Sequence, residues 1–283
     1  MKIILSRKGW DSSSGGNANP ILPDGTLVSM PIPDSQSILA YRDIIHENLN
    51  LGTLASWLSR GKIGSKAGAH LDPDLCTAAR PRLTGWRPLF GQAGAAQGHL
   101  HNQGVGEGDL FLFFGWFRQT RYEGKKLVFE RRDPGRHILF GWLQVDHVFD
   151  LSAREPLAWM REHPHCQGER GRLNTLYTAR EELQWPGLQG MKGAGLFHAL
   201  HAHHVLTAPG QTRRIWRLPA WFNPDGREST LSYHGRPEIW QREPEAVLLT
   251  SAARGQEFVL DTKHYPEAIT WTASLFGNET AIG

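Results

Sequence analysis

The sequence predicts one α+β domain, with a β-barrel core, flanking helices and elaborated loops. Three observations predict it: a continuous apolar run over residues 110–117, a second β-like run over residues 137–149 that contains a glycine, and helical patterns on either side of them. A continuous apolar run indicates a strand covered on both faces, and a glycine inside a strand indicates a bulge or a close backbone approach. Strands that bend in this way can close a small barrel.

The first third of the chain alternates short apolar runs with polar loops. Strands are predicted at residues 3–5 and 27–30, separated by a loop rich in Ser, Gly and Asn. Apolar side chains recur at helical spacing over residues 37–49, which predicts a helix there. Thr53 is a candidate cap for a second helix that ends at Leu58, and a polar loop over residues 61–80 follows.

The rest of the chain carries the long strands. Small residues favour a helix from Ala93 to Leu100, and the Glu123-Gly124 turn joins the strand over 110–117 to a hairpin partner over 126–131. Further elements are predicted at residues 137–149 (strand), 155–162 (helix), 245–250 and 257–260 (strands) and 265–276 (amphipathic helix). No repeat or long linker marks a boundary, so we expect a single domain over residues 1–283.

Composition excludes several classes of protein. The chain has 283 residues, 40% of them hydrophobic, which is enough for a sizeable core and excludes wholesale disorder. Two cysteines are too few for a secreted disulfide scaffold, and no apolar run approaches the roughly 20 residues of a membrane helix. The opening segment becomes charged at Arg7 and Lys8, so we expect no signal peptide and a cytoplasmic protein. The net charge of +3 permits a polyanionic partner without demanding one.

Familiar nucleotide-binding motifs are missing from the sequence. We find no P-loop, no Gly-x-Ser-x-Gly elbow and no Gly-x-Gly-x-x-Gly between a strand and a helix. The glycines at 104, 106 and 108 precede a strand rather than a helix, which is the wrong context for the phosphates of NAD or ATP. No cofactor is therefore identified from the sequence.

Five features follow one another in the central stretch: Trp86, a small-residue helix, the Gly108-Asp109 turn, the apolar strand and a second strand that contains Gly141. This order resembles the PUA-like superfamily, especially its EVE and ASCH branches, over roughly residues 86–150. The resemblance implies a β-barrel whose mouth has aromatic walls for a modified base, for which Trp86 and Trp116 are the candidates. An unrelated α+β sheet is the alternative.

A second group of motifs spans nearly the whole chain. Its members are Ser6 to Gly16, Pro20-Ile21, Pro31 to Pro33, His70 to Leu75, Phe90 to Val105, Asn174 to Tyr177, Gly193 to Gly195 and Gly255 to Val259. Together they resemble the nucleotide modification associated domain, type three. The resemblance implies a setting in a bacterial or phage system that modifies DNA bases. Nucleic acid or a nucleotide is then the expected partner, together with other proteins of such a system.

The opening loop is the first candidate site. It offers hydroxyls, charges and exposed backbone N–H groups in one short segment: Ser6, Arg7, Lys8, Asp11, Ser12 and Ser13, followed by Gly15 and Gly16. Arginine can grip two phosphate oxygens, lysine adds a point charge, and glycine lets the backbone approach the ligand. The alternative is a solvated Ser/Gly turn.

The second candidate site is a run of amides around the third predicted helix: Gln92, Gln97, His99, Asn102 and Gln103. An amide presents a donor and an acceptor together, which suits the edge of a base, and His99 would add acid–base chemistry near neutral pH. The same amides could instead satisfy buried backbone in a turn-rich segment.

Metal binding has weaker support in the sequence. His70, Asp72 and Asp74 could hold a hard cation or supply a general base, with Asp34 or Asp43 joining them in space, but Asp-Pro-Asp is commonly a turn. A second group is rich in histidine: His163, His165, Cys166, His198, His201, His203 and His204. Zinc sites with cysteine usually show paired spacings, which this group lacks, so solvated or core-edge histidines are favoured.

Three functions remain open from the residues alone. The first is recognition or processing of a modified base, with Trp86 and Trp116 stacking on it, the amides reading its edge, and Arg7 and Lys8 holding phosphate. The second is a hydrolase or group-transfer enzyme, with Lys8 or His99 as the base and Asp11 or Asp72 as the orienting acid. The third is a scaffold in a modification or defence complex, which would show a contiguous apolar surface patch.

Overall fold

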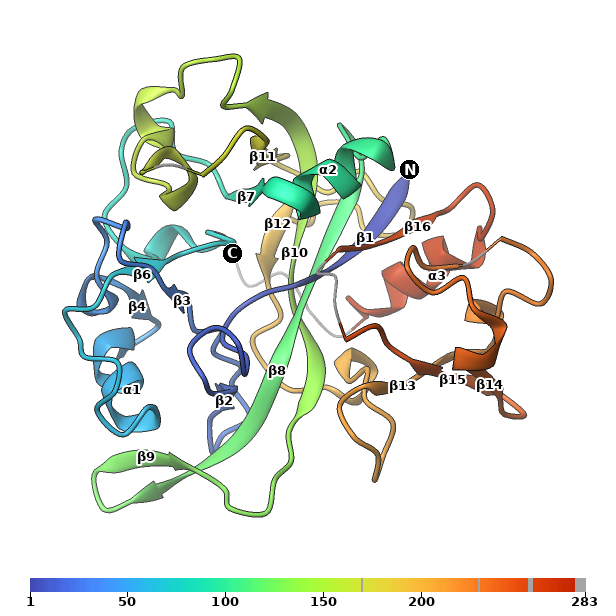
Figure 1. Cartoon of the computed structure of the whole chain (residues 1–283), viewed down its shortest axis with the longest axis horizontal. Helices are drawn as coiled ribbons and strands as arrows, with labels where there is room; N and C mark the ends of the chain where they lie inside the picture. The colour runs from blue at the N-terminus through green and yellow to red at the C-terminus, as the bar shows by residue number, and fades with distance from the viewer. Residues whose placement is uncertain (169, 229, 254–256, 278–283) are drawn as a thin grey trace.

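A strongly curved mixed sheet carries most of the chain (Figure 1). The computed structural model describes residues 1–277 apart from 169, 229 and 254–256. The main path of the sheet has the order β16 (Glu257–Asp261), β1 (Lys2–Arg7), β8 (Leu110–Glu123), β10 (Arg136–Asp150), β11 (Asn174–Ala179) and β7 (Leu89–Ala93). The β1 strand is parallel to β8 and antiparallel to β16, and the pairings from β8 to β7 are antiparallel.

Shorter elements attach to this sheet. Off the main path lie β2 (Asn19–Ile21) and β9 (Lys126–Phe129), both on β8, and β12 (Ala194–Leu196) on β10. A separate sheet has the order β13 (Ile215–Pro219), β15 (Ala246–Thr250) and β14 (Trp240–Arg242). Two small pairs join β3 (Ile32–Pro33) to β6 (Ala69–His70) and β4 (Ile45–His46) to β5 (Leu49–Asn50). The α-helices are α1 (Leu51–Leu58), α2 (Gly94–Asn102) and α3 (Glu267–Ser274).

The main sheet curls but does not close into a barrel among the described residues. The ring of Phe90 on β7 contacts Phe111 and Phe113 on β8, so the edge strand folds over the middle of the sheet. At the opposite edge, Glu257 on β16 accepts a hydrogen bond from the Gln92 side chain, and α2 packs against both edge strands. Side chains and a helix therefore bridge the gap where backbone pairing would close a barrel. The expected α+β class is confirmed, and the closed barrel is not found.

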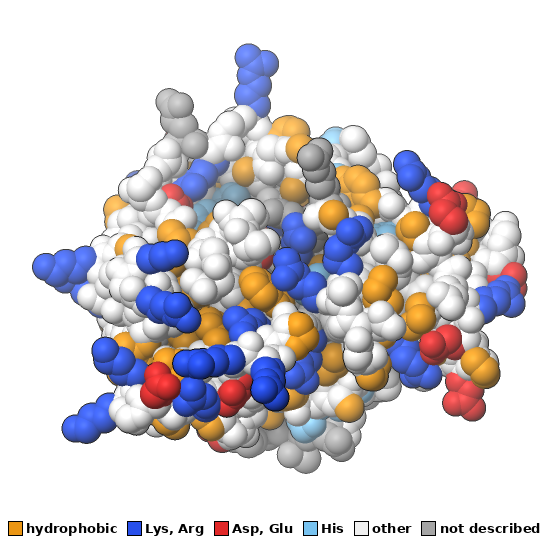
Figure 2. Space-filling model, turned by 60° about the horizontal axis from the view of Figure 1, so that its bottom comes forward, with side chains coloured by type: hydrophobic (Ala, Val, Ile, Leu, Met, Phe, Trp, Pro, Cys, Tyr) orange, Lys and Arg blue, Asp and Glu red, His pale blue; other side chains and the backbone are white. Residues whose placement is uncertain are grey.

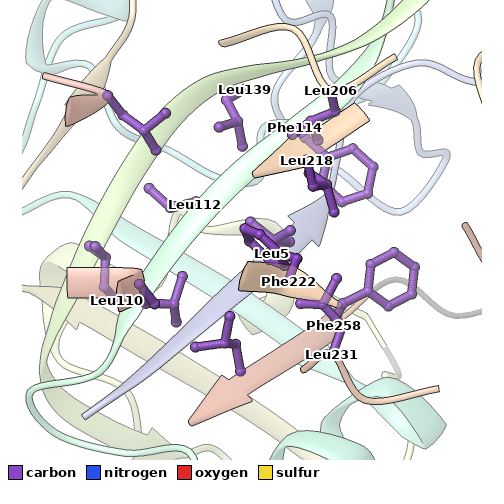
Figure 3. Close-up of a cluster of buried hydrophobic side chains, with 14 of the residues drawn as sticks. Leu5, Leu110, Leu112, Phe114, Leu139, Leu206, Leu218, Phe222, Leu231 and Phe258 are labelled. Carbon is purple, nitrogen blue, oxygen red and sulfur yellow. The ribbon is translucent and has the colours of Figure 1, made fainter. Parts of the chain in front are cut away.

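Two apolar cores lie on opposite faces of the central strands. One packs the sheet against the β13–β15 layer and α3, and Figure 3 shows Leu5, Leu112 and Phe258 pointing toward Leu218 and Phe222. The other fills the inside of the curl, with Phe90, Phe111 and Tyr177 among its members. Residues Leu110 to Phe114 are at most 1% exposed, which confirms the prediction that both faces of this strand are covered.

Most of the predicted long elements are present. The strands over 110–117, 126–131, 137–149, 245–250 and 257–260 correspond to β8, β9, β10, β15 and β16, and the helices over 93–100 and 265–276 correspond to α2 and α3. The register of β10 against β8 shifts between Leu139 and Gly141, which confirms the bulge. A Cβ on Gly141 would lie 2.8 Å from the carbonyl oxygen of Gly195, so glycine is needed for this close approach.

Other predicted elements are wrong. Residues 37–49 form a 3-10 turn at Tyr41–Asp43 and short strands, because backbone hydrogen bonds tie them to residues 65–69. Residues 155–162 contain a 3-10 turn (Ala158–Met160) in place of an α-helix, and no strand covers residues 27–30. The cap of α1 is Asn50 rather than Thr53, since the Asn50 side chain accepts from the backbone N–H groups of Gly52 and Thr53.

No helix in the described part of the chain is both long and apolar enough to cross a membrane.

Asn19 fixes the opening loop to the sheet. Its Oδ1 accepts from the backbone N–H groups of Trp10 (3.1 Å) and Met30 (2.8 Å), and its Nδ2 donates to the carbonyl groups of Trp10 and Trp116. The residue is fully buried. One side chain therefore satisfies backbone groups from three separate segments, which sets where the chain after β1 can lie.

Replacing Asn19 should test this role. We expect Asn19→Ala to lower the free energy of unfolding by about 3 kcal/mol, because several buried backbone groups lose their partners. The matched change Asn17→Ala removes one 3.3 Å hydrogen bond to the Gly15 carbonyl and should cost less than about 1 kcal/mol. Urea unfolding of the three proteins measures both values. Equal effects of the two changes would contradict the assigned role.

Candidate functional site

Four polar side chains meet where β1 ends, between the two edges of the sheet. Successive residues of a strand point to opposite faces, so Ser6 and Lys8 both face the inside of the curl. The Lys8 Nζ lies 3.0 Å from Oε1 of Glu257 and 4.5 Å from the centre of the Phe90 ring. The Gln92 amide donates to the same Oε1. We call Ser6, Lys8, Gln92 and Glu257 the buried polar site.

The buried polar site contains hydrogen-bonding capacity that the chain does not use. The side chains of Lys8 and Glu257 are 9% and 1% exposed, so the ion pair lies almost entirely out of water. Both the Glu257 Oε2 and the Ser6 Oγ are buried and have no hydrogen-bond partner among the described residues. Each such group costs about 1–3 kcal/mol. A polar ligand that supplied partners to these two atoms would recover this free energy.

His99 and Tyr233 lie beside the buried polar site. The His99 Nε2 is 2.9 Å from Oγ of Ser232, which also accepts a hydrogen bond from the backbone N–H of Val259. Burial lowers the pKa of His99, and the nearby Glu257 carboxylate opposes this shift. The Tyr233 ring is 54% exposed and lies 4.3 Å from the His99 ring. An exposed aromatic face therefore borders the site.

The other predicted amides do not converge on this site. The hydroxyl of Tyr177 donates to Oε1 of Gln97, so this amide holds α2 against β11. Asn102 and Gln103 are exposed at the end of α2. Of the predicted amides, only Gln92 contacts Glu257, the ion-pair partner of Lys8, among the described residues. Gly255 and Gln256, which belong to the motif that contains Glu257, lie outside the described residues.

Two residues of the opening segment, Lys8 and Asp11, have different partners in the structure. The Asp11 Oδ1 accepts hydrogen bonds from the backbone of Ser13 and Ser14 and from the Ser13 hydroxyl, so Asp11 holds a tight turn. Lys8 is paired with Glu257 instead. The predicted arrangement of Lys8 with Asp11 as its orienting acid therefore has no contact to support it.

Positive charge gathers on the other face of the β1 end. Arg7 points away from the inside of the curl, and the guanidinium of Arg213 lies 4.2 Å from the centre of the Trp116 ring and 3.5 Å from the Ser12 hydroxyl. This positive charge affects the pKa of the buried His137 side chain. Burial lowers this pKa to about 3, with Arg7 and Arg213 adding to the effect.

Trp86 has different neighbours from Trp116. The guanidinium of Arg82 lies 3.9 Å from the centre of the Trp86 ring and also makes two hydrogen bonds to the Asp74 carboxylate. No ring contact joins Trp86 to Trp116 in the described ranges. Each tryptophan therefore packs against an arginine, Trp86 against Arg82 and Trp116 against Arg213. No contact among the described residues supports the predicted pair of aromatic walls.

A second cluster combines residues from both predicted metal groups. His70 ends β6, Asp72 lies in the loop before β7, and His163 and His165 flank and enter a 3-10 turn (Pro164–Cys166). The Asp72 carboxylate lies 3.9 Å from the His70 Nε2, 3.3 Å from the His163 Nε2 and 3.6 Å from the His165 Nε2. We call these four residues the histidine–aspartate cluster. Asp74 is not part of it, because Arg82 binds that carboxylate.

Burial controls the charges in this cluster. It lowers the pKa of His165 to about 4 and lowers the pKa of His70, with Asp72 opposing both shifts. For Asp72, burial acts in the opposite direction, but the surrounding imidazoles outweigh it and hold the pKa below its ordinary value. Burial thus favours the neutral form of the His70 and His165 imidazoles beside the Asp72 carboxylate.

A glycine on β7 makes room for the imidazoles. A Cβ on Gly91 would lie 2.4 Å from the His165 ring and 3.0 Å from the His163 ring. The Gly91 N–H also donates to Oδ1 of Asp72 at 2.8 Å. Of the other predicted histidines, His201, His203 and His204 contact one another through their rings, whereas the His198 Nδ1 lies 3.8 Å from the Glu47 carboxylate.

Sequence reasoning missed Glu257 and the meeting of Asp72 with His163 and His165. Glu257 is the first residue of a late predicted strand, and a charged residue at that position is the local signal that could have found it. The contacts of Asp72 join segments about 90 residues apart, for which a single sequence gives no signal.

The lowered pKa of His137 predicts a dependence of stability on pH. The folded chain binds the His137 proton only near pH 3, whereas the unfolded chain binds it near the ordinary value of 6.5. His137 should therefore contribute nothing to the pH dependence above pH 6.5, and about 1.4 kcal/mol of lost stability per pH unit below it. The change His137→Asn keeps an acceptor for the Trp216 indole N–H and removes this titration. Urea unfolding between pH 7 and pH 4 should give a shallower decline for the variant, and parallel curves would contradict the assignment.

Comparison with known proteins gives one match, which covers almost the whole chain. The family model described as nucleotide modification associated domain 3 matches residues 2–261. This range runs from β1 to β16 and includes every residue of both clusters. No curated protein and no solved structure matches the chain. The chain belongs to the nucleotide modification associated domain 3 family.

Proposed function

We propose that this chain recognises a modified nucleotide, as a base of nucleic acid, in the buried polar site. The observation that carries the proposal is the pair of buried atoms without partners, Glu257 Oε2 and Ser6 Oγ, beside the Lys8 ammonium. A polar ligand would satisfy them. The family name gives the setting, since it associates the domain with nucleotide modification.

The donors and acceptors of the site favour one kind of base edge. The Glu257 Oε2 accepts a hydrogen bond, and Lys8 has N–H donors beyond the one directed at Oε1. A base with a ring N–H next to a carbonyl, as in guanine or uracil, complements an acceptor beside a donor. Adenine and cytosine also present a donor beside an acceptor, because their amino group lies next to a ring nitrogen that accepts, so the site requires this pattern rather than one particular base.

Phosphate would bind on the neighbouring surface. Arg7 directly precedes Lys8 in the chain, and both Arg7 and Arg213 lie on the other face of the β1 end. The β8–β9 hairpin projects from the lower edge in Figure 1, and Figure 2 turns that edge forward and shows Lys and Arg side chains gathered on this face. Lys125, Lys126, Arg131 and Arg132 in this region are exposed. Such a surface suits a nucleic-acid backbone.

We also propose that the fold is related to the PUA-like superfamily. This relationship is supported by the curled sheet, by the order of α2, the Gly108-Asp109 turn, β8 and the bulged β10, and by the inward position of the buried polar site. In that arrangement, the base would enter from a single strand or after flipping out of a duplex. Tyr233, rather than Trp86, would supply the exposed aromatic face.

Group transfer on the bound nucleotide is the second candidate function. The observation that favours it is the 2.9 Å contact between the His99 Nε2 and the Ser232 hydroxyl. A hydroxyl beside a neutral imidazole is the arrangement of an activated nucleophile. Protein partners within a modification system stay a further proposal, which rests on the family name.

Binding of oligonucleotides tests the proposal. We expect the protein to bind single strands that carry one modified base more tightly than matched plain strands. Higher salt should weaken both interactions, because phosphate contacts release counterions. Mass analysis of the oligonucleotide after incubation separates recognition, which leaves the mass unchanged, from group transfer, which alters it. If no oligonucleotide binds, the proposed function is wrong.

Substitutions of the partnerless atoms test the site itself. Ser6→Ala should keep or raise the stability, because it removes a buried hydroxyl that has no partner among the described residues, but should weaken binding of the preferred base about tenfold, or about 1.4 kcal/mol. Glu257→Gln should weaken binding at least as much, because an amide N–H₂ replaces an acceptor. Ser274→Ala, at an exposed residue of α3, serves as the matched control. Wild-type affinity in both site variants would place the ligand elsewhere.

A further inference from the structure

The hydrogen bonds around His70 fix which ring nitrogen faces the histidine–aspartate cluster. The His70 Nδ1 lies 2.8 Å from Oδ2 of Asp34, a carboxylate that also accepts from Arg170 at 2.6 Å. A carboxylate that binds arginine is an acceptor, so the His70 Nδ1 carries the proton. The Nε2 of the neutral ring then presents a lone pair, and this atom faces Asp72.

The same reasoning holds for His165. The Asn174 Nδ2 donates to the backbone carbonyl of His165 at 2.8 Å, which leaves Oδ1 of Asn174 facing the His165 Nδ1 at 2.7 Å. That Nδ1 is therefore protonated, and the His165 Nε2 presents its lone pair to Asp72. An acceptor that orients an imidazole through its other nitrogen is the usual arrangement behind metal-binding histidines.

Two lone pairs and a carboxylate oxygen consequently point at one another. The Asp72 Oδ2 lies 3.6 Å from the His165 Nε2 and 3.9 Å from the His70 Nε2, and the three atoms all lie within 4.8 Å of one another. These separations exceed the roughly 3.2 Å limit of a good hydrogen bond. Three acceptors with no proton to share repel one another, and a cation between them would turn that repulsion into bonds.

We propose that His70 Nε2, Asp72 Oδ2 and His165 Nε2 bind a divalent first-row transition-metal ion. The distances fit such an ion. A tetrahedral site with bonds of about 2.0–2.1 Å separates its ligand atoms by about 3.4 Å, within a few tenths of an ångström of two of the observed distances. Two imidazoles with one carboxylate suit zinc or iron(II), whereas magnesium and calcium prefer oxygen alone.

The surroundings hold the carboxylate in place for this role. The Gly91 N–H occupies Oδ1 of Asp72 and leaves Oδ2 for the ion. The His163 Nδ1 accepts from the backbone N–H of His165, so its Nε2 carries a proton. This Nε2 lies 3.3 Å from Oδ1 of Asp72, and the His163 side chain is 2% exposed. The Gly91 N–H and the His163 imidazole thus both face Oδ1, which leaves Oδ2 toward the lone pairs of His70 and His165.

The site would join two distant segments of the chain, and it does not depend on the proposed function. His70 comes from β6, Asp72 from the loop before β7, and His165 from the 3-10 turn at Pro164–Cys166. The exposed fractions of their side chains are 12%, 5% and 6%. A bound ion would therefore hold the turn against the sheet edge, and metal binding should raise thermal stability whether or not the chain binds nucleotides.

Metal binding by the full chain tests the inference. The protein, produced without a histidine tag and stripped with a chelator, would be titrated with cobalt(II) and then with zinc(II). We expect about one equivalent of cobalt(II) with visible absorption bands, displacement by zinc(II), and a higher melting temperature with either ion. Absence of binding by the wild-type protein at tenfold excess of both ions would overturn the proposal.

Asp72→Asn is the decisive variant. It keeps an oxygen for the Gly91 N–H and replaces the other oxygen with an amide N–H₂, which cannot bind a metal but can donate to the two lone pairs. We expect at least about 100-fold weaker metal binding and no metal-dependent rise in melting temperature. His101→Gln, at an exposed histidine on α2, should bind as the wild type does. Equal metal affinity in Asp72→Asn and the wild type would overturn the proposal.

Discussion

The Glu257 carboxylate joins the two edges of the main sheet, and the candidate site depends on this interaction. Its Oε1 receives Lys8 from the end of β1 and Gln92 from β7, so one oxygen ties three strands that are not neighbours in sequence. A charge that is 1% exposed must be compensated, because breaking a buried ion pair leaves an unpaired charge at a cost of several kcal/mol. The curl of the sheet and the polar character of the site therefore have a common origin.

Local patterns predicted the elements whose signals are local. The apolar run of β8 was sufficient to predict a strand buried on both faces. The glycine of β10 was sufficient to predict a bulge, and the small residues of α2 were sufficient to predict a helix. The helix over residues 37–49 failed for the opposite reason. Ile38, which completes the helical spacing, is 75% exposed, and Tyr41 donates its backbone N–H to Ala67. A partner more than 20 residues away overrode the spacing.

The candidate sites show the same division. Ser6 and Lys8 could be selected because they follow a predicted strand, and Gln92 because it belongs to a run of amides near a predicted helix. The pairing of Lys8 with Glu257 could not be predicted, since the two residues are 249 positions apart and a single sequence does not reveal that β1 pairs with β16. Asp11 took that role in the sequence interpretation through proximity alone, whereas its carboxylate is engaged by Ser13 and Ser14.

The β7 strand serves both clusters, because Gly91 and Gln92 point to opposite faces. Gly91 gives its N–H to Asp72 and leaves space for two imidazoles, and Gln92 donates to Glu257. Edge strands are commonly the least protected part of a sheet, since one side of their backbone lacks a neighbour. Here polar contacts hold both faces of the edge strand, so its position is a compromise between two sites. Both clusters therefore depend on the position of the same edge strand, because adjacent residues of β7 contact Asp72 on one face and Glu257 on the other.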